Sequence, residues 1–299
     1  MTIFEYLGYD EKVLLEISSN LENYYLSYPI KKRKGFRWID APLNPLKAIQ
    51  KTILDKLIYL LPAHPAAVGF VPGKGVKDGA KKHVGANLLI CLDIENFFSS
   101  IYFRHVIRII YMLLQKGEDL DLFEIPNYHD TSVLITKLLT YKGALPQGAP
   151  SSPALANLYC LSIDKHLQHF ADANDLKFSQ YADDLSFSTM DENFKVARLI
   201  SFVKTILSRD YLNLNMRKTR VLRQNKRMLV TGVVVNKQTS VAKKYWRNLR
   251  AQIHNIKDTT LLDEKEYQQL RGKISWVHSL NAKRGTALLT QLGQIKYKT

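Results

Sequence analysis

The chain has 299 residues, 46% of them hydrophobic, and its 43 Lys and Arg outnumber its 27 Asp and Glu to give a formal net charge of +16. This length can bury a large core, and no apolar run approaches the ~18 residues of a membrane span, so we exclude a membrane protein. A strong positive surplus spread along a chain is typical of proteins that bind nucleic acid in a groove, although a generally basic surface is the plainer alternative. No basic-then-apolar leader opens the sequence, so we expect a cytoplasmic protein in which Cys91 and Cys160 are buried, reduced thiols.

The first half of the chain predicts several helices around one buried strand. Residues 1–27 show a short helical pattern. Asn44 and Pro45 indicate the start of a helix, with Asn as the N-cap and Pro in the first turn, and its apolar stripe would be formed by Ile49, Ile53, Leu57 and Leu60. The Pro- and Gly-rich residues 63–85 predict a loop. The apolar run 87–94 predicts a buried strand, and helices are expected over about 102–115 and 131–141.

The second half predicts more strands and a helical tail. After the turn-rich residues 142–153, we expect a helix from Ser152-Pro153 to about Phe170, then two short strands around a tight turn in residues 176–188. Asp191 would cap a helix to about Leu207, and the β-branched residues 228–236 are expected to form a strand. The rest is expected to be helical, with one apolar face formed by Ala242, Tyr245, Trp246, Leu249, Ile253 and Ile256. This order predicts a mixed sheet covered by helices, followed by a helical tail domain.

Three acids stand in strand-like surroundings. Asp93 ends the apolar run, where a charge is costly without a partner, and Asp183 and Asp184 are adjacent within FSQYADDLSFS. If the turn at 182–184 lies beside the end of strand 87–94, these carboxylates converge, and hard oxygen ligands without a His or Cys set favour Mg²⁺. Two such ions about 4 Å apart support phosphoryl transfer. Taken alone, the Asp-Asp pair is more simply an acidic hairpin turn.

Three motifs together resemble those of reverse transcriptases. LDIENFFSSI at 92–101, LPQGAPSSPALANL at 145–158 and YADD at 181–184 have the order and spacing of that family over residues 30–236. The second motif is most similar to the bacterial retron branch and its group II intron relatives. The resemblance implies an α+β fold of right-hand polymerase architecture, in which the palm is a mixed or antiparallel sheet with helices on one face. N-terminal helices and fingers would occupy 1–90, the palm 91–236 with a finger insertion at about 103–145, and a helical thumb 237–299.

The resemblance also implies the roles of individual residues. Asp93, Asp183 and Asp184 would be the catalytic acids that bind two Mg²⁺ ions, with Asp183 the stronger ligand and the Ile94 carbonyl a further one. Phe98 matches the aromatic gate that selects dNTP substrates over NTPs, which opposes an RNA polymerase; the alternative is a core residue.

Four more residues would contact the nucleotide by the same resemblance. Gln147 and Gly148 match the loop against the nucleotide and template, and Arg37 in RWIDAP matches the finger arginine on the triphosphate. A planar guanidinium suits phosphate oxygens. Lys218 in NMRKT matches the lysine near the leaving pyrophosphate, or belongs to a solvated basic face.

Two further segments favour a retron enzyme. Ala80 and His83 match an Asn-Ala-X-X-His element, with Gly79 in place of Asn, and residues 230–232 match a Val-Thr-Gly triplet. The expected nucleic-acid contacts are His83, Val230, Thr231, Gly232, Lys243, Lys244, Arg247 and Arg250. From the chain length, we expect no endonuclease or DNA-binding region of the mobile-intron type.

A retron enzyme would have a structured noncoding RNA as its partner and prime from a 2′-hydroxyl of an internal guanosine. It would make a branched RNA–DNA product (msDNA) and work with an effector protein encoded nearby in phage defence. The alternatives are a diversity-generating, abortive-infection or intron-derived reverse transcriptase, or a noncatalytic RNA-binding scaffold with the same fold.

Overall fold

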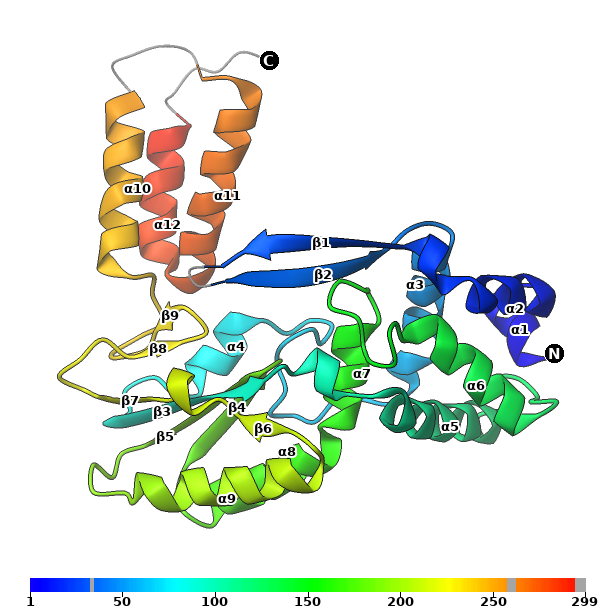
Figure 1. Ribbon diagram of the computed structural model, residues 1–299. Helices are drawn as coiled ribbons and strands as arrows, with labels where there is room; N and C mark the ends of the chain where they lie inside the picture. Colours follow the sequence, from blue (N-terminus) through cyan, green and yellow to red (C-terminus); the bar gives the residue numbers. More distant parts are fainter. Residues whose placement is uncertain (33–34, 257–261, 294–299) are drawn as a thin grey trace.

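The computed structural model describes residues 1–32, 35–256 and 262–293 (Figure 1). The N-terminal part holds α1 (Ile3–Leu7), α2 (Glu11–Ser19), β1 (Tyr25–Lys31), β2 (Phe36–Pro42) and α3 (Leu46–Lys56). β1 and β2 form an antiparallel hairpin in which Ile30 lies opposite Arg37. The helical pattern expected over 1–27 therefore ends early. The hairpin was not predicted, because most of its side chains are exposed and show no alternation of apolar and polar residues.

Two details around α3 differ from the sequence-based expectation. Pro45, not Asn44, occupies the N-cap position, and no side chain caps this helix end. Leu57 is buried as expected, but it follows the last residue of α3, and Leu60 falls in a separate 3₁₀ turn, Ile58–Leu60. The predicted loop 63–85 contains a short helix, α4 (Val76–Lys81), because the Asp78 carboxylate accepts a hydrogen bond from the Gly75 amide at 2.9 Å and starts the helix.

The central sheet is antiparallel throughout and is built around β3 (Leu88–Glu95). β5 (Asp184–Thr189) pairs with one edge of β3, and β4 (Lys177–Tyr181) pairs with β5. β6 (Asn213–Leu214) and β7 (Arg220–Arg223) pair with the other edge. The predicted strand at 87–94 and the two strands around a tight turn are thus confirmed.

The two faces of β3 contact different parts of the core. Leu88, Ile90 and Leu92 belong to the main hydrophobic cluster, on the face that α8 (Leu161–Asp172) and α9 (Val196–Arg209) cover (Figure 1). Leu89 and Cys91 belong to a second cluster with residues of α4 and of the segment around β8 (Leu229–Val230) and β9 (Val233–Val234). The long helices thus cover one face, as expected, while the short helix α4 and the β8–β9 segment pack against the other. Because side chains alternate along a strand, Asp93 shares the face of Leu89 and Cys91.

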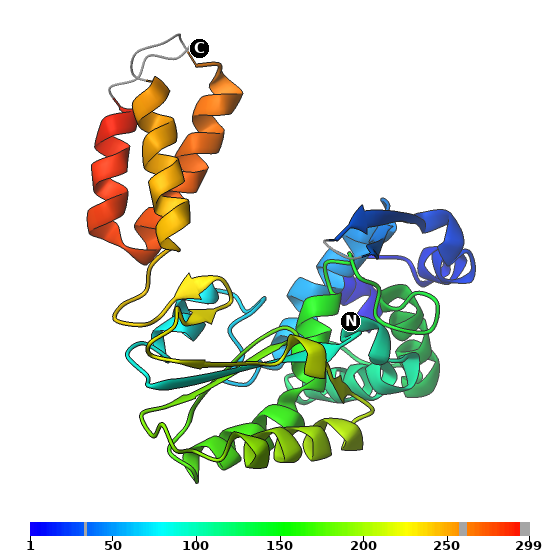
Figure 2. The same cartoon turned by 60° about the vertical axis from the view of Figure 1, so that its left-hand side comes forward.

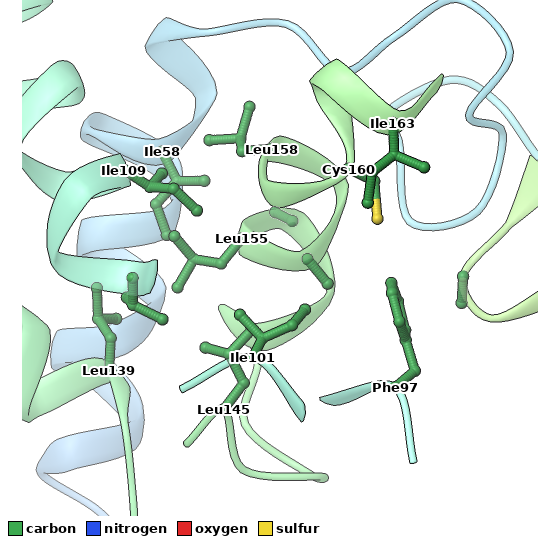
Figure 3. Packing of buried hydrophobic residues seen from close by; sticks show 14 of the residues in the cluster. Ile58, Phe97, Ile101, Ile109, Leu139, Leu145, Leu155, Leu158, Cys160 and Ile163 are labelled. Carbon is green, nitrogen blue, oxygen red and sulfur yellow. The ribbon is translucent and has the colours of Figure 1, made fainter. Parts of the chain in front are cut away.

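The helix predicted for about 152–170 is two helices, α7 (Ser152–Tyr159) and α8, that meet at Cys160. Figure 3 shows Leu155 and Leu158 of α7 packed among apolar side chains of several elements, namely Ile58, Ile101, Ile109 and Leu139. The other predicted helices are α5 (Phe103–Asp119) and α6 (Tyr128–Leu139). Asp191 does not cap α9, which begins after Lys195; its carboxylate instead accepts from the Asn193 amide. Both cysteines are buried and free, as expected.

The predicted strand at 228–236 is a small hairpin. Thr231 (φ 46°) and Gly232 (φ 84°) are left-handed and form the turn between β8 and β9. The tail then forms α10 (Lys243–Ile256), α11 (Glu264–Leu280) and α12 (Ala282–Leu292), a bundle that stands apart from the sheet (Figure 2). Residues 257–261 and 294–299 of the expected thumb lie outside the described residues.

The apolar face expected in the tail is largely confirmed. Leu249 and Ile253 are buried, whereas Tyr245 is exposed and does not belong to this face. Within the part of the chain that the structure describes, no helix combines the length and the apolar character needed to cross a membrane.

Candidate active site

Three carboxylates meet where β3 and the β4–β5 hairpin end. The strand register places Asp93 directly opposite Asp184, so both side chains share one face of the sheet. Tyr181 pairs with Asp184, which leaves Ala182 and Asp183 as a two-residue turn. The Ile94 amide donates to the Asp183 carbonyl at 2.9 Å and ties this turn to β3. The turn therefore lies beside the end of β3, as the sequence predicts.

The acids repel one another in a partly desolvated place. Burial raises the pKa of Asp184 to about 6, helped by the negative charges of Asp183 and Asp93. Burial and the charge of Asp93 also raise the pKa of Asp183, although the charges of Lys218 and Arg37 act in the opposite direction. A cluster of this kind favours a bound cation, because a cation offsets the part of the repulsion that Lys218 and Arg37 leave.

Lys218 lies at the centre of this charge cluster. Its ammonium group stands 2.8 Å from Asp93 Oδ2, and the side chain of Lys218 is 55% exposed whereas that of Asp93 is 10% exposed. The Asn215 amide donates to the Asp93 carbonyl at 2.8 Å, which holds the 3₁₀ turn Met216–Lys218 against β3. The lysine expected near the leaving pyrophosphate is thus beside the acids.

The donor set fits a divalent metal by its chemistry. Asp93 Oδ1 is buried and has no hydrogen-bond partner, and carboxylate oxygens are the ligands that Mg²⁺ prefers. The side chain of Ile94 carries no donor atom, so its backbone carbonyl would be the ligand from this residue. Among residues 1–32, 35–256 and 262–293, no three acid, His or Cys side chains already surround one ion position.

Arg37 and the Gln147 loop form one unit at the edge of β2. The Asp40 amide donates to the Gln147 carbonyl at 3.0 Å. A Cβ on Gly148 (φ 138°) would lie 2.9 Å from the Asp40 carbonyl oxygen, so only glycine lets the loop approach β2 this closely. Arg37 is exposed, and its charge lowers the pKa of Asp183. The structure therefore brings Arg37 within electrostatic reach of the acids and docks the Gln147 loop on the same strand as Arg37.

Phe98 follows β3 through a reversal at Asn96 (φ 49°). Its ring is half-buried, with its centroid 5.4 Å from that of Phe97, which is the buried core residue of the pair. A ring that is partly open to solvent at this position agrees with either interpretation of Phe98, gate or core.

Two of the expected nucleic-acid contacts are buried. His83 has no exposed surface, and its ring nitrogens lie 2.7 Å from Ser188 Oγ and 2.8 Å from Ser179 Oγ. Burial lowers the pKa of His83 to about 3, so the ring is neutral and joins β4 to β5. Val230 packs in the second cluster. Neither side chain can contact a nucleic acid in this structure, and we correct both assignments.

Gly79, which stands where the retron element has asparagine, lies at a close packing contact. A Cβ there would be 2.8 Å from Val68 Cγ2. The remaining expected contacts are accessible. Thr231 and Gly232 form a turn at the base of the bundle, and one helix presents four exposed basic residues, Lys243, Lys244, Arg247 and Arg250.

The structure adds candidate site residues that the sequence did not indicate. Arg220 on β7 lies opposite Cys91 and lowers the pKa of Asp184, and it lines a hollow of about 270 Å³ together with Asp93, Asp184 and Lys218. Arg220 lies in a dense basic stretch, so the sequence does not distinguish it from its basic neighbours. Residues 66–69 run beside β4 next to the turn. In the sequence, their glycine and small residues indicated only a loop.

Comparison with known proteins agrees with this geometry. The reverse transcriptase (RNA-dependent DNA polymerase) family matches residues 30–235. The retron Mx162 reverse transcriptase of Myxococcus xanthus is 35% identical over 91% of this chain, and the match spans 61% of that relative. The retron Ec86 reverse transcriptase of Escherichia coli is 30% identical over 92% of this chain and 82% of its own.

Solved structures show the same fold at low sequence identity. The apo telomerase of Candida tropicalis superposes with a TM-score of 0.53 at 13% identity, over 97% of this chain and 64% of that chain. A foamy viral protease–reverse transcriptase bound to double-stranded DNA gives a TM-score of 0.50 at 16% identity, over 92% of this chain and 40% of that chain. The expected polymerase fold is therefore confirmed. The chain belongs to the reverse transcriptase family, in its retron branch.

Proposed function

We propose that this chain is an RNA-directed DNA polymerase whose active site is the carboxylate cluster of Asp93, Asp183 and Asp184. The observation that carries the proposal is the convergence of these three acids at one end of β3, with Lys218, Arg37 and Arg220 around them. Phosphoryl transfer needs mainly positioning and charge neutralisation, and a cluster of this composition supplies both.

Asp93, Asp183 and Asp184 would hold two Mg²⁺ ions, with Asp183 the stronger ligand and the Ile94 carbonyl a further one. Bound there, the ions would activate the attacking hydroxyl and neutralise charge on the leaving group. Lys218, which is paired with Asp93 in this structure, supplies a positive charge beside the acids that would bind the pyrophosphate of a dNTP. Arg37 faces the same place with a planar guanidinium, which suits phosphate oxygens.

The remaining parts of the site select and position the nucleotide. Gln147 and Gly148 hold the loop that docks on β2, and Phe98 would exclude a ribose 2′-hydroxyl. We assign the fingers to residues 1–90, the palm to 91–236 with a finger insertion at about 103–145, and the thumb to 237–299. The hairpin β1–β2 and the bundle α10–α12 support this division, because the hairpin lies above the sheet that carries the acids and the bundle stands apart from it (Figures 1 and 2).

The partner we propose is a structured noncoding RNA, copied from an internal guanosine 2′-hydroxyl into a branched RNA–DNA product. Similarity to two retron reverse transcriptases supports this choice. The exposed basic residues of α10 and the Thr231–Gly232 turn would bind the RNA by its backbone and shape. We further propose that the protein works with an effector protein encoded nearby, in phage defence, and that it acts in the cytoplasm.

Replacing Asp183 by asparagine tests the activity. Extension of an RNA-templated primer with dNTPs and Mg²⁺ should fall by about a thousandfold or more, while RNA binding stays within twofold. Asp191→Asn, an exposed acid beyond β5, is the matched control and should leave both unchanged. If Asp183→Asn extends the primer at the normal rate, the assignment of the active site is refuted. If the wild-type protein binds RNA but extends no primer, the proposed polymerase activity is refuted.

The RNA partner needs a separate experiment. The protein is purified from its host and the bound nucleic acid is sequenced. A branched RNA–DNA species identifies the retron reaction, whereas an unbranched cDNA bound to the protein would identify another bacterial branch of the family.

A further inference from the structure

Residues 66–69 form a backing strip behind the turn that carries Asp183. The Gln180 amide donates to the Ala66 carbonyl at 2.9 Å, and the Val68 amide donates to the Gln180 carbonyl at 2.9 Å. Ala67 and Gln180 thereby make a parallel bridge, so the strip extends the β4–β5 hairpin on the side away from β3. The strip ends at Gly69, beside the turn.

Gly69 touches the turn directly. A Cβ at Gly69 would lie 3.0 Å from the Ala182 amide nitrogen and 3.1 Å from the Tyr181 ring, so the backbone of residue 69 rests against the turn with no space between them. Ala182 has a left-handed φ of 51°, which costs energy for any residue with a side chain. Such a conformation persists only where its surroundings hold it, and Gly69 is part of that support.

Asn157 fixes the position of Gly69. Its side chain is 2% exposed, and Nδ2 donates to the Gly69 carbonyl at 2.9 Å across 88 positions of sequence. Asn157 lies on α7, between Leu155 and Leu158, whose packing in the main core anchors this helix (Figure 3). The amide thus connects a rigid helix to the strip behind the turn.

We propose that Asn157 is a positioning residue for the metal-binding turn: through Gly69 it sets where Asp183 stands. The turn is held from two sides, by the Ile94 amide on β3 and by Gly69 on the strip. Loss of the Asn157 amide weakens the support on the side of the strip, which then keeps its backbone bonds to Gln180. This inference rests on the proposed function, because it assigns Asn157 to the same carboxylate site. A displacement of about 1 Å in a catalytic group can cost about a hundredfold in rate.

Two variants test the proposal from opposite ends of the contact. Asn157→Asp keeps the shape of the side chain and replaces the donor with an oxygen that repels the Gly69 carbonyl. Gly69→Ala keeps Asn157 and adds a methyl group against Ala182. Asn174→Asp is the matched control, because Asn174 Nδ2 likewise donates to a backbone carbonyl, that of Phe170 at 2.8 Å, but at the end of α8, outside both the strip and the turn.

The first readout is Mn²⁺ binding to the full chain without nucleotide, followed by electron paramagnetic resonance. The second is single-nucleotide incorporation against Mg²⁺ concentration, with the primer–template Kd measured separately. All assays run at a temperature at which melting curves show each variant folded. We expect the Mn²⁺ Kd to rise about fivefold or more and kcat to fall about tenfold or more in both test variants, with the primer–template Kd within about twofold of wild type. The control should match the wild type.

The outcomes separate this inference from the proposed function. If the wild type and Asp183→Asn both fail to polymerise, the proposed function is wrong. If the wild type polymerises and Asp183→Asn does not, yet Asn157→Asp and Gly69→Ala bind Mn²⁺ and turn over normally, the positioning role alone is refuted. Lower melting temperatures with unchanged Mn²⁺ affinity also refute it, because they show a purely structural contact. Should Asn157→Asp not fold, Gly69→Ala decides alone.

Discussion

Replacing Asp184 by asparagine should stabilise the metal-free protein at neutral pH. Burial, then the charges of Asp183 and Asp93, raises the pKa of Asp184 from its ordinary 3.8 to about 6. At about 1.4 kcal/mol per pKa unit, this shift corresponds to ~3 kcal/mol against the ionised form. Asp184 is partly open to water, and screening reduces the figure to about 1–2 kcal/mol. Asparagine has nearly the same shape without the charge, so the variant avoids this cost.

The pH dependence of the effect has a definite sign. Because the pKa of Asp184 is higher in the folded than in the unfolded protein, the folded state binds the proton more tightly between about pH 4 and pH 6. The contribution of Asp184 to wild-type stability therefore falls as the pH rises through this window. The advantage of Asp184→Asn should be complete above about pH 7, about half as large near pH 5 and small near pH 4.

Thermal unfolding in EDTA measures this effect. At pH 7.5 the variant should melt about 2–5 °C above the wild type, and at pH 5 the difference should be about half as large. Excess Mn²⁺ should raise the melting temperature of the wild type more than that of the variant, because the wild type keeps all three carboxylates. Asp191→Asn should show no difference at either pH. A variant that melts below the wild type in EDTA at pH 7.5, or whose advantage is the same at pH 5, would refute the repulsion argument.

Three further changes test other parts of the molecule. Phe98→Ala should raise the ratio of ribonucleotide to deoxyribonucleotide incorporation by about tenfold or more, and an unchanged ratio assigns Phe98 to the core. His83→Ala should lower the free energy of unfolding by about 2–4 kcal/mol, because a cavity opens and two buried serine hydroxyls lose their partner. Its RNA affinity, measured where the variant is folded, should not change; a selective loss of affinity would reinstate a direct contact. A quadruple variant of α10, with glutamine at Lys243, Lys244, Arg247 and Arg250, should bind RNA more weakly. The slope of log K against log salt should fall by about 3. An unchanged slope would show that the RNA binds elsewhere.

The parts of the fold that could be predicted are those whose cause is local. The apolar run before Asp93 indicates β3, because a strand buried on both faces consists of continuous apolar residues. The YADD turn is indicated by the strands on either side of it, in which apolar and polar residues alternate. The hairpin β1–β2 has no such signal, since it contributes little to the core and exposes apolar rings such as Trp38. The β-branched run around Val230 hides a turn for the opposite reason: the propensity of its residues favours a strand, and the left-handed Thr231 and Gly232 override it.

The parts of the site that could not be predicted depend on distant contacts. His83 is buried between Ser179 and Ser188, which lie 96 and 105 positions away in the sequence. Asn157 bonds to Gly69 across 88 positions. Histidine and asparagine are also common on protein surfaces. The sequence around such a residue therefore does not distinguish a contact with RNA from a hydrogen bond within the core. Arg220 was hidden in the same way, among neighbouring basic residues.

The placement of Asp183 and Asp184 gives the two adjacent acids different environments. Asp184 is fixed by the strand register opposite Asp93 and lies in the field of Arg220 on β7. Asp183 stands in the turn, tied to β3, and lies in the field of Arg37 on the hairpin β1–β2. The pKa of Asp184 reaches about 6, and a carboxyl must lose its proton before it binds a metal, so below this pH the ligand role of Asp184 is weakened by protonation. The charge of Arg37 favours the ionised form of Asp183, and a carboxylate must be ionised to bind a metal, which agrees with its proposed role as the stronger ligand. Exchanging each acid for asparagine should therefore give unequal losses of activity, with Asp183→Asn the more severe.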